Sequence, residues 1–276
     1  MSDTPLTAAP DDPPPGEKLR LGGMALRNGL LVHGPTCWAA AVRTDAGEIK
    51  AASGRKPRLR SADGIPGVRG IARLAEAMAV IPLVKRGLPE VKLPFQDPGV
   101  IAVAAGATLG GSVLKRRVRG AGGEAAAAVV SFMPALFALR GGDLAAYHGV
   151  EHKAIGAYED GDEDARDATK EHERCGSHLV APMLVSNLAG TLLLRRAIST
   201  PGPLANGAVA LASSALAVEV FAWSERNSGS SLSKALKRPG FEIQRLIGTR
   251  EPDERQLEVG RAALAEVLSA EQAAAV

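Results

Sequence analysis

The sequence predicts a mainly α-helical fold, a multi-span membrane helical bundle with a small N-terminal β-containing segment, and therefore an α+β class overall. Four long runs without charged residues occupy the middle of the chain, with arginine or lysine at several of their ends. Hydrophobic residues make up 46% of the 276 residues and aromatic residues only 3%, which indicates a core of alanine, valine and leucine. Residues 21–53, which precede these runs, are rich in glycine and are interrupted by turn residues, a pattern typical of short strands and turns.

The N-terminal part divides into a tail and a small folded segment. Residues 1–19 are rich in proline and polar residues, which predicts a disordered tail, and they lack the basic start and apolar run of a secretory signal. Residues 20–92 are expected to form a small α+β segment. Within it, turn residues at 45–47 predict a hairpin that joins strands at 38–43 and 48–52.

Helical periodicity appears on both sides of the apolar region. Apolar residues recur at three- and four-residue intervals over 70–81, and Pro82 is then expected to disturb the hydrogen-bond ladder. The C-terminal segment, residues 241–276, is expected to form an amphipathic helix with Asp253 as its N-cap. Its apolar face is expected to pack on the rest of the protein.

Residues 93–240 are predicted to form a membrane-embedded helical domain. Its uncharged runs cover residues 98–114, 125–139, 175–194 and 197–218. A span needs about 20 mostly apolar residues, so the last two runs qualify, the first is marginal and the second is short unless it begins before Glu124. Small residues in these runs suit close helix packing in a lipid bilayer, the expected partner, but they also leave open a soluble bundle of buried helices.

Charge and cysteine content narrow the function classes. The net charge is only +3, and the basic residues form short clusters without interleaved aromatic residues. Nucleic acid is therefore not an expected partner. The two cysteines lie far apart in the sequence and do not suggest a disulfide framework, so we assume a reducing compartment.

The most informative motif is a pair of histidines and a glutamate in the middle of the chain. On a helix, His148, Glu151 and His152 stand at i, i+3 and i+4 and share one face. The order His-x-x-Glu-His is also that of inverzincin metallopeptidases. A string this short also occurs by chance in ordinary helices, but His172 and Cys175 follow twenty residues later and would complete a His3Cys shell for a divalent metal, most simply zinc.

These residues suggest metal-assisted hydrolysis, with Glu151 as the catalytic base that takes a proton from water. Four protein ligands would close a tetrahedral zinc site, whereas catalytic zinc keeps one position open. There are two possibilities. If the site is catalytic, one of the four residues does not bind the metal, and we expect Cys175 to be that residue. If all four bind the metal, the site is structural. The two hypotheses are a hydrolase acting on a lipid-linked or peptide substrate, and a non-catalytic membrane scaffold or transport accessory with a structural metal.

The sequence resembles the YqhQ-like family of bacterial membrane proteins of unknown function, which are described as predicted metal-dependent enzymes. The resemblance rests on motifs at 147–153, 172–176 and 250–258, and it extends from about residue 21 to 268. It implies a multi-span protein of the bacterial plasma membrane with a metal site and no established substrate. We expect that site on the cytoplasmic side.

The sequence departs from the family pattern at several positions. Met24 and Asn28 stand where the family has a glutamine and a glutamate, while Glu173 and His178 replace a proline and a small hydroxyl residue. If the N-terminal carboxylate contributes to the family's chemistry, this member has altered activity, because Asn28 can form hydrogen bonds but cannot act as a base.

Overall fold

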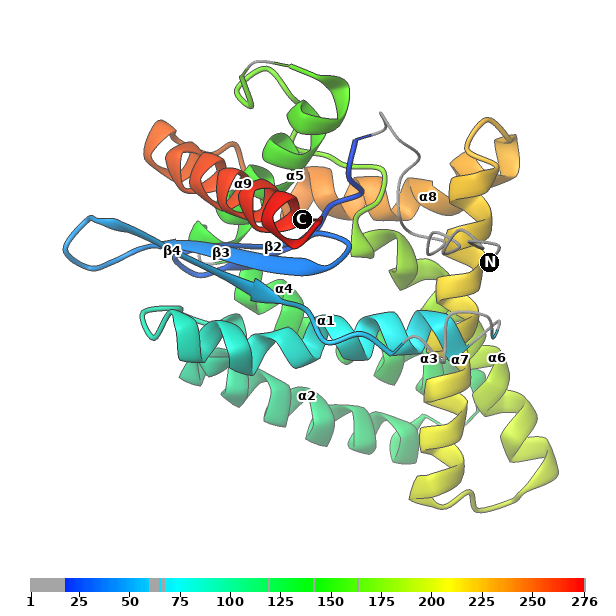
Figure 1. The fold of residues 1–276 in the computed structure, drawn as a ribbon. Helices are drawn as coiled ribbons and strands as arrows, with labels where there is room; N and C mark the ends of the chain where they lie inside the picture. The colour runs from blue at the N-terminus through cyan, green and yellow to red at the C-terminus, as the bar shows by residue number, and fades with distance from the viewer. Residues whose placement is uncertain are drawn as a thin grey trace, which may run out of the picture.

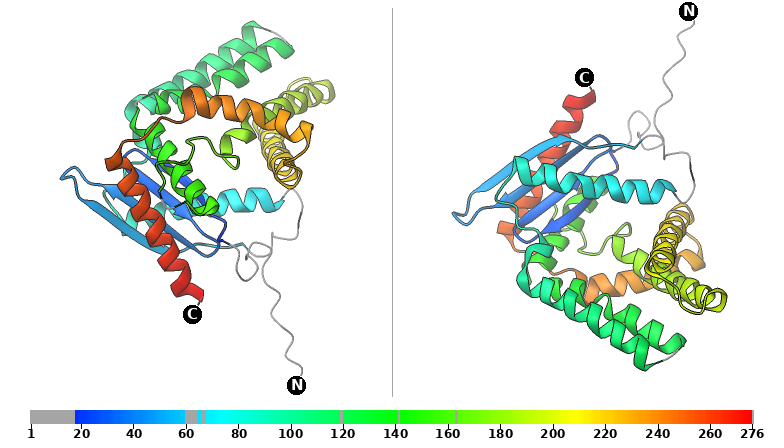
Figure 2. Two further views of the ribbon diagram at one scale, coloured as in Figure 1. Left: turned by 90° about the horizontal axis from the view of Figure 1, so that it is seen from above. Right: turned by 90° about the horizontal axis from the view of Figure 1, so that it is seen from below.

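In the computed structural model, a four-stranded sheet is covered by helices on both faces, and the long apolar helices extend to one side (Figure 1). The structure describes residues 18–59, 65, 68–118, 120–140, 142–162 and 164–275. The predicted disordered tail lies outside the described residues except for its last two positions. Figure 2 shows α9 crossing one face of the sheet and α1 crossing the other.

The sheet is an antiparallel meander. Its strands, in spatial as well as chain order, are β1 (Gly22–Leu26), β2 (Gly29–His33), β3 (Cys37–Arg43) and β4 (Ile49–Arg55). The predicted hairpin is confirmed as β3 and β4, and Gly47 adopts a positive φ of 88° in the turn that joins them. The sequence analysis missed β1 and β2, because glycines obscure the alternation of β1 and β2 is apolar along most of its length.

Alternate residues of the central strands enter two separate cores. Leu30, Val32 and Ala41 face α5 (Asp143–Asp160) and α9 (Glu254–Ala275). On the opposite face, residues such as Trp38 and Val42 pack against α1 (Val68–Gly87). Because both faces are covered, the central strands are apolar at nearly every position, as expected for a buried sheet.

Helix α1 differs from its prediction. It runs from Val68 to Gly87 with Pro82 inside it, so the helix continues beyond residue 81, where the predicted periodicity ends. A proline in a helix interior costs about 3 kcal/mol because it removes one hydrogen bond and crowds the preceding turn. Val80 and Val84, one on each side of the proline, are both buried against the sheet, and this packing keeps the two halves of the helix aligned.

Four segments have the length and apolar composition to cross a membrane, which supports the prediction of a multi-span membrane protein. They are Pro98–Arg117, Gly122–Leu139, Gly176–Ala197 and Pro203–Arg226. The first is helix α2, and the last two contain α6 (Val180–Ala197) and α7 (Pro203–Arg226). The second begins before Glu124, as its length requires, and consists of α3 (Ala121–Val130) and α4 (Met133–Leu139).

Large apolar side chains on these four segments point outward. Leu109, Val185 and Leu193 are each more than half exposed, and exposed apolar surface of this extent marks a membrane or an interaction surface. Glu124 is buried and pairs with Lys115 of α2 at 3.0 Å and with Arg195 of α6 at 2.5 Å. This ion triad joins the first pair of spans to the second.

The C-terminal helix α9 packs on the sheet through its apolar face, but it begins at Glu254 rather than at residue 241. Asp253 caps α9 by accepting a hydrogen bond from the Gln256 backbone N–H at 2.8 Å, and Gln256 accepts one in return from the Asp253 N–H at 3.0 Å. Before α9, the chain forms α8 (Ser231–Ile243) and a single π-helical turn at Gln244–Gly248. The helix α5, which carries the histidine motif, shares its core with the sheet and α9.

Asn28 has a structural role in the turn between β1 and β2. Its side-chain amide donates to the carbonyl oxygens of Arg43 at 3.1 Å and Glu90 at 3.0 Å, and its amide oxygen accepts from the Lys92 N–H at 3.0 Å. A carboxylate could make only the last of these bonds. Asn28 therefore fits its surroundings as an amide.

We expect Asn28→Asp to lower the stability of the protein by about 1–3 kcal/mol, because two carbonyl groups would lose their donor and face a carboxylate. Thermal unfolding in detergent measures this as a lower midpoint. The control is Asp45→Asn, which removes only an exposed ion pair with Lys92 and should cost about 1 kcal/mol or less. Equal midpoints for Asn28→Asp and wild type would contradict this account of Asn28.

Candidate metal centre

Helix α5 presents its two histidines to a pocket beside the sheet. His148 and His152 lie one turn apart, and their ring centroids are 4.4 Å from each other. His152 is only 2% exposed. The expected arrangement of the motif on one helix face is therefore present in the structure.

Backbone carbonyl groups orient both imidazole rings. The Nδ1 atom of His148 is 2.8 Å from the carbonyl oxygen of Gly248, and that of His152 is 2.6 Å from the carbonyl oxygen of Lys170. Because a carbonyl oxygen only accepts, each Nδ1 must carry the hydrogen, which leaves the Nε2 lone pair of each neutral ring free. Metal-binding histidines are commonly oriented in this way.

The third member of the cluster is Cys175. Its Sγ lies 3.4 Å from the Nε2 atom of His148, and the ligand atoms of His148, His152 and Cys175 all lie within 4.8 Å of one another. The buried Nε2 atom of His152 has no hydrogen-bond partner among the described residues. Two imidazole nitrogens and one sulfur atom form a donor set that suits zinc, and the unpartnered Nε2 atom is where an ion would be expected to bind.

His172 lies beside this cluster but is oriented differently. Its Nδ1 accepts a hydrogen bond from the Arg174 backbone N–H at 3.2 Å, and its Nε2 is 3.3 Å from a carboxylate oxygen of Glu159. Both ring nitrogens are thus engaged with protein groups. The structure brings together three of the four predicted ligands, and it is His172 rather than Cys175 that lies outside the three-residue cluster.

Glu159 forms an ion pair with Arg174 as well as its contact with His172. Burial by itself would raise the pKa of this carboxyl group, but the hydrogen bond from His172 and the charge of Arg174 outweigh burial and hold its pKa below the usual value. The carboxylate therefore stays ionised near neutral pH and fixes the ring of His172. Neither Glu159 nor Arg174 is among the residues that the sequence analysis assigned to the site.

Glu151, the predicted base, lines the same pocket of about 420 Å³ as the three clustered residues. Its side chain packs on the backbone of Gly23 in β1, where an added Cβ would lie 2.7 Å from the Glu151 Cγ. No hydrogen bond or ion pair joins the Glu151 carboxylate to another residue in the described ranges. The remaining pocket wall includes apolar residues, among them Leu21, Leu139, Leu144 and Ile155.

The π-helical turn at 244–248 forms hydrogen bonds with residues of the site. The sequence analysis missed this turn. Its last residue, Gly248, provides the carbonyl group that orients His148. Its first residue, Gln244, is fully buried, and its side chain accepts from the His172 N–H at 2.7 Å and donates to Ser177 Oγ at 2.9 Å. A π-helical turn is rare and often marks a functional site, but it has no clear sequence signal.

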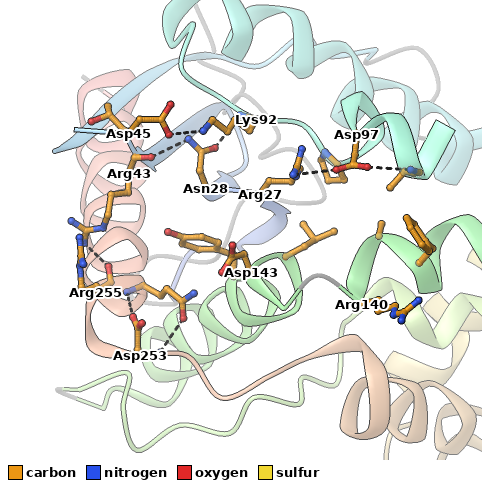
Figure 3. A pocket seen from close by; sticks show the side chains of 18 residues that line it. Arg27, Asn28, Arg43, Asp45, Lys92, Asp97, Arg140, Asp143, Asp253 and Arg255 are labelled. Carbon is orange, nitrogen blue, oxygen red and sulfur yellow. Dashed lines mark hydrogen bonds and ion pairs between the residues drawn. The ribbon is translucent and has the colours of Figure 1, made fainter. Parts of the chain in front are cut away.

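Figure 3 shows a second pocket, of about 740 Å³. It shares Pro94 and Leu144 with the first pocket. Charged side chains line much of it. Arg27 pairs with Asp97 at 3.1 Å, and Lys92 pairs with Asp45 at 2.6 Å. Asn28, one of the departures from the family pattern, lies in this second pocket, whereas Met24 lines the pocket with the metal cluster.

Residues 136–270 match the family model described as "Protein of unknown function (DUF1385)". The match covers just under half of the chain, and we call residues 136–270 the DUF1385 segment. The expected resemblance to a family of unknown function is thereby confirmed, although the match starts at 136 rather than near 21. The DUF1385 segment contains all the residues predicted for the site, together with the π-helical turn and most of α9. No curated protein and no solved structure matches the chain.

Gly149 lies between the two motif histidines. It permits close packing of α5 on the backbone that follows the π-helical turn. An added Cβ at this position would collide with the carbonyl oxygen of Arg250. The Arg250 N–H donates to the Ala145 carbonyl oxygen at 2.9 Å, so the two backbones are held together. The same contact brings the Gly248 carbonyl to His148.

We expect Gly149→Ala to destabilise the protein by about 1–3 kcal/mol because the Arg250 backbone must move away. The movement should also weaken retention of any metal held by His148, which elemental analysis after mild chelation measures. Gly156→Ala is the control on the same helix, because its added Cβ would meet nothing closer than 4.0 Å. Loss of stability in Gly156→Ala but not in Gly149→Ala would contradict the packing argument.

Proposed function

We propose that this protein is a membrane-embedded hydrolase that depends on a divalent metal ion, most simply zinc. His148, His152 and Cys175 would hold the ion. The observation that carries the proposal is the buried, unpartnered Nε2 atom of His152, which faces a second imidazole and a thiol. Leaving such a polar atom unpaired costs about 1–3 kcal/mol, and a bound cation would remove this cost.

Three protein ligands favour a catalytic over a structural site, because a tetrahedral ion would keep one position open toward the pocket. A bound ion supplies Lewis-acid activation, which makes water a stronger nucleophile at neutral pH. The carboxylate of Glu151 would accept the proton that this water releases and deliver it to the leaving group. The unpaired state of this carboxylate and its place in the same pocket support that role.

The pocket lies where the soluble-facing and membrane-facing parts of the chain meet. Leu139 ends the second candidate span and Gly176 begins the third, and both residues line the pocket. This location supports a substrate that reaches the site from the membrane surface, either a lipid-linked molecule or a peptide. The alternative, a scaffold or transport accessory with a structural metal, does not account for the open pocket beside Glu151.

We also propose that the metal centre faces the cytoplasm of a bacterial cell, at the plasma membrane. Cys37 and Cys175 are both free thiols, and the cytoplasm is the compartment that keeps thiols reduced. A reduced Cys175 is required for a thiolate ligand.

Elemental analysis of detergent-purified protein tests the metal site. We expect about one zinc ion per chain in the wild type, and loss of that ion from His148→Ala, His152→Ala and Cys175→Ala. His172→Ala is the matched control and should retain the ion, because both of its ring nitrogens are engaged elsewhere. A well-folded wild type without metal would overturn the proposal.

The role of Glu151 is tested by Glu151→Gln in the same preparation. We expect the metal content to be unchanged and hydrolysis to fall by about 10²–10⁴-fold, because the amide cannot accept the proton. The measurement is the turnover of fluorogenic peptide, ester and phosphodiester probes. A wild type that retains metal and hydrolyses none of these probes would favour the structural alternative.

A fusion of green fluorescent protein to the C-terminus tests the side of the membrane. Helix α9 packs on the sheet beside α5, so the C-terminus reports the side on which the metal centre lies. We expect a fluorescent fusion in bacterial cells and an inactive alkaline phosphatase fusion. The opposite pair of results would place the site outside the cytoplasm.

A further inference from the structure

Strand β1 lines the metal-site pocket along its backbone. Gly22, Gly23, Met24 and Ala25 all border the pocket, although consecutive side chains of a strand point to opposite faces of the sheet. Four successive residues can border one pocket in this way only when the pocket lies along the edge of the strand. Gly23 lets the Glu151 side chain pack directly on this strand, so the proposed base lies beside that edge.

Between Gly22 and Leu26, the described part of the chain shows no backbone hydrogen bond on this edge. At its two ends the Leu21 carbonyl oxygen accepts from Arg174, and the Arg27 N–H donates to the Lys92 carbonyl oxygen at 2.9 Å. β1 is the first strand in the sheet order and pairs only with β2. In an antiparallel pair, every second residue directs its N–H and C=O groups away from the partner strand. Because β1 borders the pocket of His148, His152, Cys175 and Glu151, we expect these groups to face that pocket.

We propose that the pocket binds an extended peptide segment as an added strand on the free edge of β1, and that this peptide is the substrate of the metal centre. Addition of a strand to a sheet edge is an established mode of peptide recognition, in which main-chain hydrogen bonds provide affinity and side-chain pockets provide specificity. The binding mode stands on the strand geometry alone, whereas cleavage rests on the function proposed above.

The continuity of the two pockets supports an extended ligand. The first pocket follows β1, and the second begins at Arg27 and Asn28, the turn residues that follow this strand. They share Pro94 and Leu144, so a peptide bound along β1 would continue into the second pocket beyond the strand pairing, which ends where the Arg27 N–H donates to the Lys92 carbonyl oxygen at 2.9 Å. A strand of four residues alone spans about 13 Å.

The lining of each pocket indicates the class of peptide. Apolar side chains, including Leu139, Leu144 and Ile155, border the pocket around the cluster and suit an apolar residue next to the cleaved bond. The second pocket is lined by both cationic and anionic side chains and suits a polar continuation. The preferred peptide therefore combines an apolar residue at the cleaved bond with polar residues on one side.

Cleavage of this peptide would follow ordinary amide hydrolysis. Water adds to the carbonyl carbon of the peptide as the new C–O bond forms, and the C–N bond breaks. The Glu151 carboxylate takes one proton from water and transfers it to the departing amine, so no co-reactant other than water is required.

The test begins with a library of decapeptides randomised at their central positions, incubated with metal-loaded protein in detergent. Mass spectrometry identifies any cleaved peptide, and Glu151→Gln then provides a protein that should bind the peptide without cutting it. Each backbone nitrogen of the selected peptide is methylated in turn. Only alternate N–H groups of an added strand reach β1, so we expect methylation to weaken binding by roughly tenfold at every second position and by much less at the intervening ones.

The outcomes separate this inference from the proposed function. Protein that retains its metal and hydrolyses ester or phosphodiester probes, or lipid vesicles, but neither binds nor cleaves any library peptide would overturn the peptide inference and leave the hydrolase proposal intact. A methylation profile without the two-residue period would overturn strand addition. Periodic binding to protein that holds no metal would support the binding mode and overturn the hydrolase proposal instead.

Discussion

The geometry of the candidate metal centre depends on two hydrogen bonds, from the Nδ1 atoms of His148 and His152 to backbone carbonyl groups. Each bond determines which ring nitrogen carries the hydrogen and directs the other nitrogen toward Cys175. The two carbonyl groups belong to Gly248 and Lys170, which are distant from the histidines in the sequence. The two histidines can therefore be oriented for metal binding only when the loop that contains Lys170 and the turn that contains Gly248 have both folded against α5.

The π-helical turn contacts both parts of the site, His148 on α5 and the loop before α6. Its Gly248 carbonyl orients one histidine, while the buried Gln244 side chain holds the loop between His172 and Ser177. Close packing at two glycine residues holds α5 against the π-helical turn and α9. Gly149 admits the backbone that follows the turn, and Gly260 of α9 admits Val150 of α5. The dense packing of α5 against α9 and the sheet positions the site more firmly than a helix exposed at the membrane surface would allow.

The sheet and the membrane helices form different walls of the same pocket. The edge of β1 provides backbone groups, α5 provides the proposed ligands and base, and the ends of the candidate spans provide apolar side chains. This arrangement explains why a small sheet outside the DUF1385 match is relevant to residues inside it. It also explains why the charged second pocket continues directly from the first, since both follow the β1–β2 hairpin.

The sequence by itself determined the helical membrane class, the β3–β4 hairpin, the capped C-terminal helix and the metal-capable face of α5, because these depend on local periodicity, turn residues and spacing. Tertiary structure decided the rest. The sequence could not distinguish His172 from Cys175 as the third member of the cluster, because the difference depends on Glu159 and Arg174 engaging the His172 ring. Likewise, packing against the sheet carries α1 through Pro82, and contacts with distant carbonyl groups give Asn28 its structural role. Local patterns predict which groups a segment offers, but only the folded chain determines which of those groups meet.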